Sequence, residues 1–244
     1  MDIAVVTERL THKLRIFRMP DMAPVDNGGI VVFKGETGVD ERDLMGIALY
    51  RRSDDGAVFA VAGRKTGPSG SYLRQYLLHD DCMGMVKATL FRKFGIFSGK
   101  KEIEAIVVDD ELGFVYYSDE GVGVRKYYAD PAMGNKQLAL FAAEGFTDDH
   151  EGISIYQTTP ATGYIIVSDQ GADKFHIFPR EGTADNPHNH PLMKVVKVAA
   201  HESDGSDVTS VALGGLFPKG LFVAMSNDRT FHYYSWEDIM SNPC

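Results

Sequence analysis

Cysteine is scarce in this sequence. Among its 244 residues only Cys82 and Cys244 are cysteines, and no CxxC pair occurs, which excludes a disulfide-rich scaffold. Long apolar runs are also lacking, because no segment approaches the roughly 18 residues of a membrane-spanning helix. The first residues, MDIAVVTERL, lack the basic and then apolar segments of a secretory signal peptide. We therefore expect no membrane partner.

Basic residues are outnumbered. The chain has 25 Lys and Arg against 34 Asp and Glu, giving a formal net charge of -9. Non-specific nucleic-acid binding needs a basic surface, so we expect no nucleic-acid partner. An acidic protein can still bind an anionic ligand if metal cations lie between the two.

The common short catalytic motifs are missing as well. We find no GxSxG, P-loop, HExxH, GxGxxG or EF-hand pattern. The histidines of NPHNH, His188 and His190, could imitate a zinc pair, but no third ligand lies nearby in the sequence. His150 beside carboxylates fits a structural hydrogen-bonding role better than a metal ligand.

What the chain does have is a repeat of short strand-like runs separated by Gly, Asp and Asn turns. Helical periodicity is rare, which indicates an all-β fold. Similar segments begin at Met45, Glu104, Glu151 and Asp207, and their spacing of about 45 to 60 residues is typical of β-propeller blades with loop insertions. We predict that residues 1–244 form a single propeller domain.

The first residues match only the second half of this repeat. DIAVVTERLTHKLRIFRM corresponds to a second strand, a polar loop and a third strand. The sequence therefore predicts about four and a half blades, beginning in mid-blade. Because an open propeller exposes strand edges, we expect a segment preceding these residues to complete the domain.

Charged and amide residues recur at two places in the repeat. The repeat opens on Glu104, Glu151 and Asp207. The loops after the second strand carry Glu8–Arg9, Arg64–Lys65, Asp119–Glu120, Asp169–Gln170 and Asn227–Asp228. A propeller brings equivalent positions to one end of its channel, where converging carboxylates repel one another unless cations neutralise them. Oxygen ligands suit Ca²⁺, although any single acidic loop residue on a propeller most often lies in a solvated turn.

Several strings together resemble the β-propeller phytases, which are Ca²⁺-dependent phytate phosphohydrolases. The strings are IEAIVVDDELGFVYYSDEGVGVRKY, DDHEGISIY, GYIIVSDQGADKFHIF, SDGSDV, GLFPKGLFVAMSND and SWEDI, and they cover nearly the whole chain. The resemblance implies a six-bladed propeller, of which this chain carries the later part, and an extracellular or periplasmic location.

The resemblance also implies a site. Its metal ligands would be Glu104, Asp119, Glu120, Asp149, Glu151, Gln170, Asp204 and Asp207. Five of these, Glu104, Asp119, Glu120, Asp149 and Glu151, would be catalytic, and the phosphate-binding residues would be Arg9, Arg64 and Lys65. In FTDDHEGISIY, Asp148 and His150 would then face away or support the two ligands with which they alternate.

The implied function is hydrolysis of phytate, or of another inositol polyphosphate, as a 3-phytase-type phosphomonoesterase with several Ca²⁺ ions. Metal ions would activate the attacking water and clamp the phosphoryl oxygens, and no protein nucleophile is required. Three alternatives stay open: a non-catalytic calcium-binding propeller module, an inactive fragment, and another calcium-dependent propeller hydrolase such as a lactonase.

Overall fold

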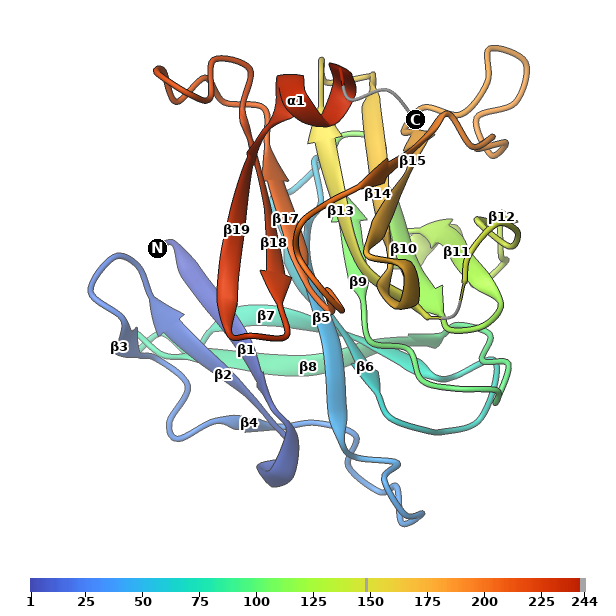
Figure 1. Ribbon diagram of the computed structural model, residues 1–244. Coiled ribbons are helices and arrows are strands. Elements are labelled where there is room, and N and C mark those ends of the chain that lie inside the picture. The colour runs from blue at the N-terminus through green and yellow to red at the C-terminus, as the bar shows by residue number, and fades with distance from the viewer. Residues whose placement is uncertain (148, 242–244) are drawn as a thin grey trace.

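The chain folds as a five-bladed β-propeller with almost no helix, shown as a computed structural model in Figure 1. The structure describes residues 1–147 and 149–241. Asp148 and Cys244, which the sequence singled out, lie outside the described residues. No helix in the described ranges is long and apolar enough to cross a membrane.

Each blade is an antiparallel sheet built largely from consecutive strands. Blade 1 contains β1 (Ile3–Glu8), β2 (Lys13–Arg18), β3 (Ala23–Pro24) and β4 (Ile30–Val31). Blade 2 contains β5 (Leu44–Arg51), β6 (Val58–Arg64), β7 (Leu73–Asp80) and β8 (Val86–Phe94). Blade 3 contains β9 (Ile106–Asp109), β10 (Phe114–Asp119), β11 (Gly123–Tyr128) and β12 (Ala139–Phe141).

Blade 4 contains β13 (His150–Gln157), β14 (Gly163–Asp169), β15 (Lys174–Pro179) and β16 (Lys194–Lys197). Blade 5 has three strands, β17 (Ser206–Thr209), β18 (Leu221–Ser226) and β19 (Thr230–Ser235), followed by helix α1 (Trp236–Ser241). Short 3-10 turns occupy Arg9–Thr11, Pro131–Met133 and Gln170–Ala172. The all-β propeller prediction is confirmed, whereas the predicted count of about four and a half blades is not, because five sheets form.

Apolar side chains of neighbouring blades form the core. Alternation along the strands places one apolar face of each sheet against the next blade. Between blades 2 and 3, for example, Phe59 and Tyr72 belong to the same buried cluster as Val115 and Tyr117. Similar clusters join blades 1 and 2, 3 and 4, and 4 and 5.

The innermost strands approach one another closely around the channel. β5 contacts β9, β9 contacts β13, and β13 contacts β17. A Cβ atom on Gly46 of β5 would lie 2.0 Å from the backbone oxygen of Glu104, and one on Gly152 of β13 would lie 3.0 Å from that of Asp204. Glycine at these positions therefore sets the spacing of the blades where the predicted site residues lie.

Blades 1 and 5 differ from the other three. β1 pairs only with β2, whereas its repeat equivalent β6 pairs with both β5 and β7. On blade 5, Phe231 and Tyr233 are 65% and 63% exposed. Among the described residues, these two blades share no interface as extensive as those between the other neighbours. An apolar face of blade 5 is consequently open to solvent.

Candidate metal and phosphate site

The second strands of blades 2, 3 and 4 end in the residue pairs Arg64–Lys65, Asp119–Glu120 and Asp169–Gln170, of which the first member closes the strand and the second follows it. These pairs are held in the same way. The backbone N–H of the second member donates to a carbonyl in the loop before the innermost strand. The distances are 2.8 Å from Lys65 to Asp43, 3.2 Å from Glu120 to Glu102 and 3.3 Å from Gln170 to Asp149. This repeated bond places Lys65, Glu120 and Gln170 at the same end of the channel.

Three carboxylates converge at that end. Glu120, Asp149 and Glu151 each offer an oxygen, and these oxygens all lie within 4.8 Å of one another. No other such group of His, Cys, Asp or Glu occurs in residues 1–147 and 149–241. Glu120 comes from blade 3 and the other two from blade 4, and the Ser118 hydroxyl joins the blades by donating to the backbone oxygen of Glu151 at 2.9 Å. We call Glu120, Asp149 and Glu151 the carboxylate cluster.

Burial makes the ionised form of this cluster costly. Glu120 and Glu151 are both only 5% exposed. Burial, and then the charge of Glu120, raises the pKa of Glu151 to about 9. Burial, followed by the charges of Asp149 and Glu104, raises the pKa of Glu120 to about 7. Two full negative charges cannot lie this close in a desolvated site without a compensating cation or proton.

The cluster also contains oxygens that nothing in the protein satisfies. Glu120 Oε1 and Glu151 Oε2 are buried and have no hydrogen-bond partner. Unpaired buried acceptors are rare in native proteins, and a bound ion or water is one way in which such oxygens are satisfied. The donors are all oxygen atoms, which is the ligand type that Ca²⁺ and Mg²⁺ prefer. The residues therefore fit a hard divalent cation.

Glu104, Gln170 and Asp204 border the cluster. Burial and the neighbouring Glu102 raise the pKa of Glu104. Gln170 Nε2 donates to the carboxylate of the exposed Asp204, and the charges of Glu104 and Asp204 both contribute to the raised pKa of Glu151. These three residues thus neighbour the cluster, and Asp204, in the loop before β17, adds a carboxylate from blade 5.

Asp207 lies apart from this group. It is exposed on β17, and its Oδ1 accepts the N–H of Val208 at 2.8 Å. Its neighbours are the Val223 and Met225 side chains on the open face of blade 5. The structure does not bring Asp207 to the carboxylate cluster.

Asp119 is turned into the protein body. It is fully buried and pairs with Arg125 at 2.7 Å. Its carboxylate also accepts the backbone N–H of Ser98 at 3.1 Å and the Ser98 hydroxyl at 2.7 Å. Asp119 thereby anchors the loop that leads to Glu104 and is fully engaged in protein contacts.

Arg64 is likewise buried. Its guanidinium donates to the backbone oxygens of Glu41, at 3.1 Å, and Ser71, at 3.3 Å. The same group lies 4.8 Å from the centre of the Phe33 ring, and burial lowers its pKa. The structure therefore assigns Arg64 contacts with the protein itself.

Of the three predicted phosphate-binding residues, Arg9 and Lys65 reach the rim. Arg9 Nη2 lies 3.9 Å from a Glu104 oxygen, and its Nε donates to the backbone oxygen of Leu44 at 3.2 Å. Lys65 Nζ lies 3.3 Å from Glu102. Both side chains are partly exposed, so they can exchange these surface ion pairs for an anionic ligand at small cost.

Sequence reasoning missed two residues at this rim, Lys101 and Glu102. Lys101 Nζ contacts the carboxylate of Asp149. A signal for Glu102 was available, because Glu102 and Glu104 have the same two-residue spacing as Asp149 and Glu151. No comparable pattern distinguishes Lys101 from the other charged residues of its loop.

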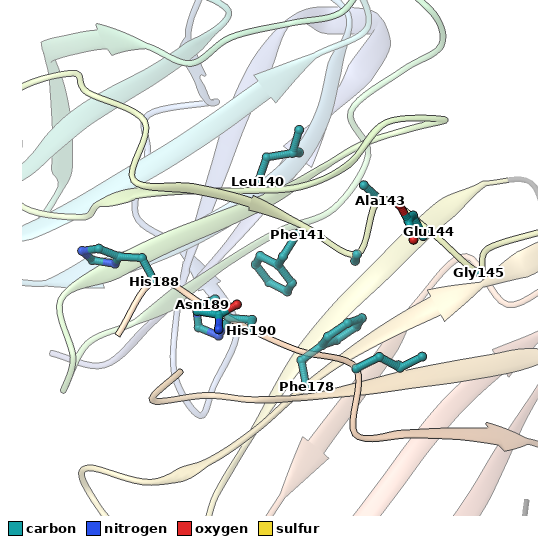
Figure 2. Close-up of a pocket in the computed structure, with 11 residues that line it drawn as sticks. Leu140, Phe141, Ala143, Glu144, Gly145, Phe178, His188, Asn189 and His190 are labelled. Atoms are coloured by element: carbon teal, nitrogen blue, oxygen red, sulfur yellow. The ribbon is translucent and has the colours of Figure 1, made fainter. Parts of the chain in front are cut away.

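The NPHNH histidines line a separate hollow between blades 3 and 4, beside Phe141 and Phe178 (Figure 2). His190 Nδ1 donates to the backbone oxygen of Pro179 at 2.7 Å, and its Nε2 accepts from Lys126 Nζ at 3.1 Å. Both ring nitrogens are thus engaged within the protein. His188 and His190 belong to no three-residue metal-ligating group among the described residues.

This chain is similar to known proteins in two comparisons, one with protein-family profiles and one with curated proteins. The profile of the family described as Phytase matches residues 2–235. A 3-phytase of Bacillus subtilis (strain 168) is 30% identical over 209 residues, which cover 81% of this chain and 53% of that protein. The chain thus spans about half the length of this relative.

Proposed function

This chain belongs to the phytase family, and on that premise we propose that it is a calcium-dependent phosphomonoesterase that hydrolyses phytate. The observation that carries the proposal is the carboxylate cluster, with its two unpartnered buried oxygens, beside the cationic Arg9 and Lys65. Phytate is a dense polyanion, and other inositol polyphosphates have the same chemistry.

Glu120, Asp149 and Glu151 would hold the cation, and Glu104, Gln170 and Asp204 would complete the oxygen ligands of one or more further ions. When bound, such a cation supplies positive charge for the phosphoryl oxygens and an acidified water as the nucleophile. Arg9 and Lys65 would contact phosphate groups, Arg9 through paired N–H donors and Lys65 as a mobile point charge.

The buried residues keep the ligands in place. Asp119 fixes the loop before Glu104, and the Ser118 hydroxyl fixes the backbone at Glu151. Because the ligand side chains are pre-positioned, less conformational entropy is lost when the cation and the substrate bind. The rigid inner ends of blades 3 and 4 thus act as the support for the site.

The proposal includes the six-bladed ring of the family, with a further sheet packed on the open face of blade 5. The exposed Phe231 and Tyr233 and the unpaired edge of β1 support it, since exposed apolar faces and strand edges commonly mark interaction surfaces. A longer form of the protein would contribute this sheet.

The test is phosphate release from phytate, measured with Ca²⁺ and then with a chelator, for this chain and for a form extended upstream. We expect Ca²⁺-dependent release that Glu151→Gln abolishes. Glu144→Gln removes the same charge at an exposed position outside the carboxylate cluster and serves as the control. Calcium binding without phosphate release by the extended form would instead favour the non-catalytic calcium-binding module.

A further inference from the structure

Lys101 places an ammonium group against the carboxylate cluster. It lies in the loop that joins β8 of blade 2 to β9 of blade 3, and its Nζ contacts the carboxylate of Asp149 from blade 4. The Asp119 carboxylate anchors this loop at Ser98. The Lys101 side chain is 41% exposed, so it can leave Asp149 for solvent.

Lysine is suited to such an exchange. Its ammonium is a compact charge on a flexible stem, with three donors and no fixed planar geometry. It partly neutralises the three carboxylates, but the two buried oxygens of Glu120 and Glu151 still lack partners. A divalent cation at the cluster would meet these oxygens and would compete with Lys101 for the Asp149 carboxylate.

We propose that Lys101 is a built-in competitor of the metal ion, an internal counter-ion that must release Asp149 before a divalent cation can bind the cluster fully. This inference rests on the proposed function only for the presence of a cation at Glu120, Asp149 and Glu151. It adds a residue that sets the cation affinity of the site.

A purely structural role for Lys101 has the opposite consequence. If the Lys101–Asp149 contact served only to hold Asp149 in a binding position, its removal would loosen Asp149 and weaken cation binding. If Lys101 competes with the cation, its removal strengthens cation binding. The sign of the change in calcium affinity therefore separates the two roles.

The experiment is isothermal titration calorimetry of the metal-free full chain with Ca²⁺. We expect Lys101→Met to lower the calcium dissociation constant by about 2- to 5-fold, the size of a partly exposed charge pair. Lys101→Arg retains the charge and should stay near the wild-type value. Lys100→Met is the matched control, because Lys100 Nζ donates to the backbone oxygen of Gly121 at 3.2 Å.

The same comparison in a chain that lacks one cluster ligand tests whether Lys101 acts through the carboxylate cluster. In Glu151→Gln, which removes a cluster ligand, adding Lys101→Met should no longer change calcium affinity. Equal or weaker calcium binding by Lys101→Met in the otherwise wild-type chain would overturn the inference while leaving the proposed metal site intact. No calcium binding by either protein would overturn the metal site and the inference together.

Discussion

Asp119 and Asp169 occupy equivalent positions on blades 3 and 4 and make equivalent bonds. Asp119 accepts the N–H and hydroxyl of Ser98, and Asp169 accepts the N–H and hydroxyl of Thr147, at 3.0 and 3.4 Å. Each aspartate is the last residue of the second strand of its blade. Its side chain anchors the loop that leads to the innermost strand of the same blade. The following residues, Glu120 and Gln170, lie at the channel mouth.

Asp119→Asn should destabilise the protein. Arg125 is 7% exposed and would lose its anionic partner, and leaving one member of a buried pair alone costs about 3–5 kcal/mol of unfolding free energy. Urea denaturation of the metal-free chain measures this loss. Glu120→Gln is the adjacent control, and it should leave that free energy unchanged or raise it, because it removes carboxylate repulsion. Equal losses in both variants would contradict these separate roles.

Lys65→Met and Arg64→Met should affect different properties. Lys65 is 37% exposed at the rim, so its loss should raise KM for phytate about tenfold through a lost charged contact with little effect on stability. Arg64→Met removes buried bonds to Glu41 and Ser71 and should lower the unfolding free energy by about 2–4 kcal/mol. Steady-state kinetics and urea denaturation check the pair, and a stable Arg64 variant with raised KM would reverse the assignment.

His190 should contribute to acid sensitivity. Burial lowers its pKa from 6.5 to about 4, so between these values the unfolded chain binds a proton that the folded chain does not. The stabilising contribution of neutral His190 to the unfolding free energy is therefore complete above pH 6.5. As the pH falls from 6.5 towards 4, this contribution is lost, and the unfolding free energy decreases by about 3 kcal/mol.

His190→Gln removes this titration. The decrease in unfolding free energy between pH 7 and pH 4.5 should be smaller in this variant than in the wild type. The exposed His79→Gln is the control and should follow the wild type. The same decrease in all three proteins would mean that His190 does not titrate as described.

Gly46→Ala should disturb the channel wall. The added methyl group would lie 2.0 Å from the backbone oxygen of Glu104, and backbone cannot yield as a flexible side chain can. Overpacking of this kind costs about 1–3 kcal/mol, measured by thermal or urea unfolding. Gly205→Ala meets only the Met225 side chain, at 3.8 Å and beyond, and should be nearly neutral. A neutral Gly46→Ala would mean that the inner strands can separate without cost.

Much of the fold was visible in the sequence because strand and turn signals recur in every blade. The recurrence also located the residue pairs that meet at the channel. It could not show which member of a pair faces the channel, since Asp119 and Glu120 are both acidic and differ only in direction. Lys101 and Asp149 lie on different blades, 48 positions apart, and their contact depends on how neighbouring blades pack.

In each of these pairs, one residue stabilises the fold and the next residue supplies a functional group at the channel mouth. The first residue of a pair makes the buried bonds of its blade, whether it is Arg64, Asp119 or Asp169. The second contributes a cation, a carboxylate or an amide to the channel mouth in Lys65, Glu120 and Gln170. The charge of the mouth can therefore change one blade at a time while the supporting contacts persist. Related propellers could acquire different ligands through single substitutions at the second position.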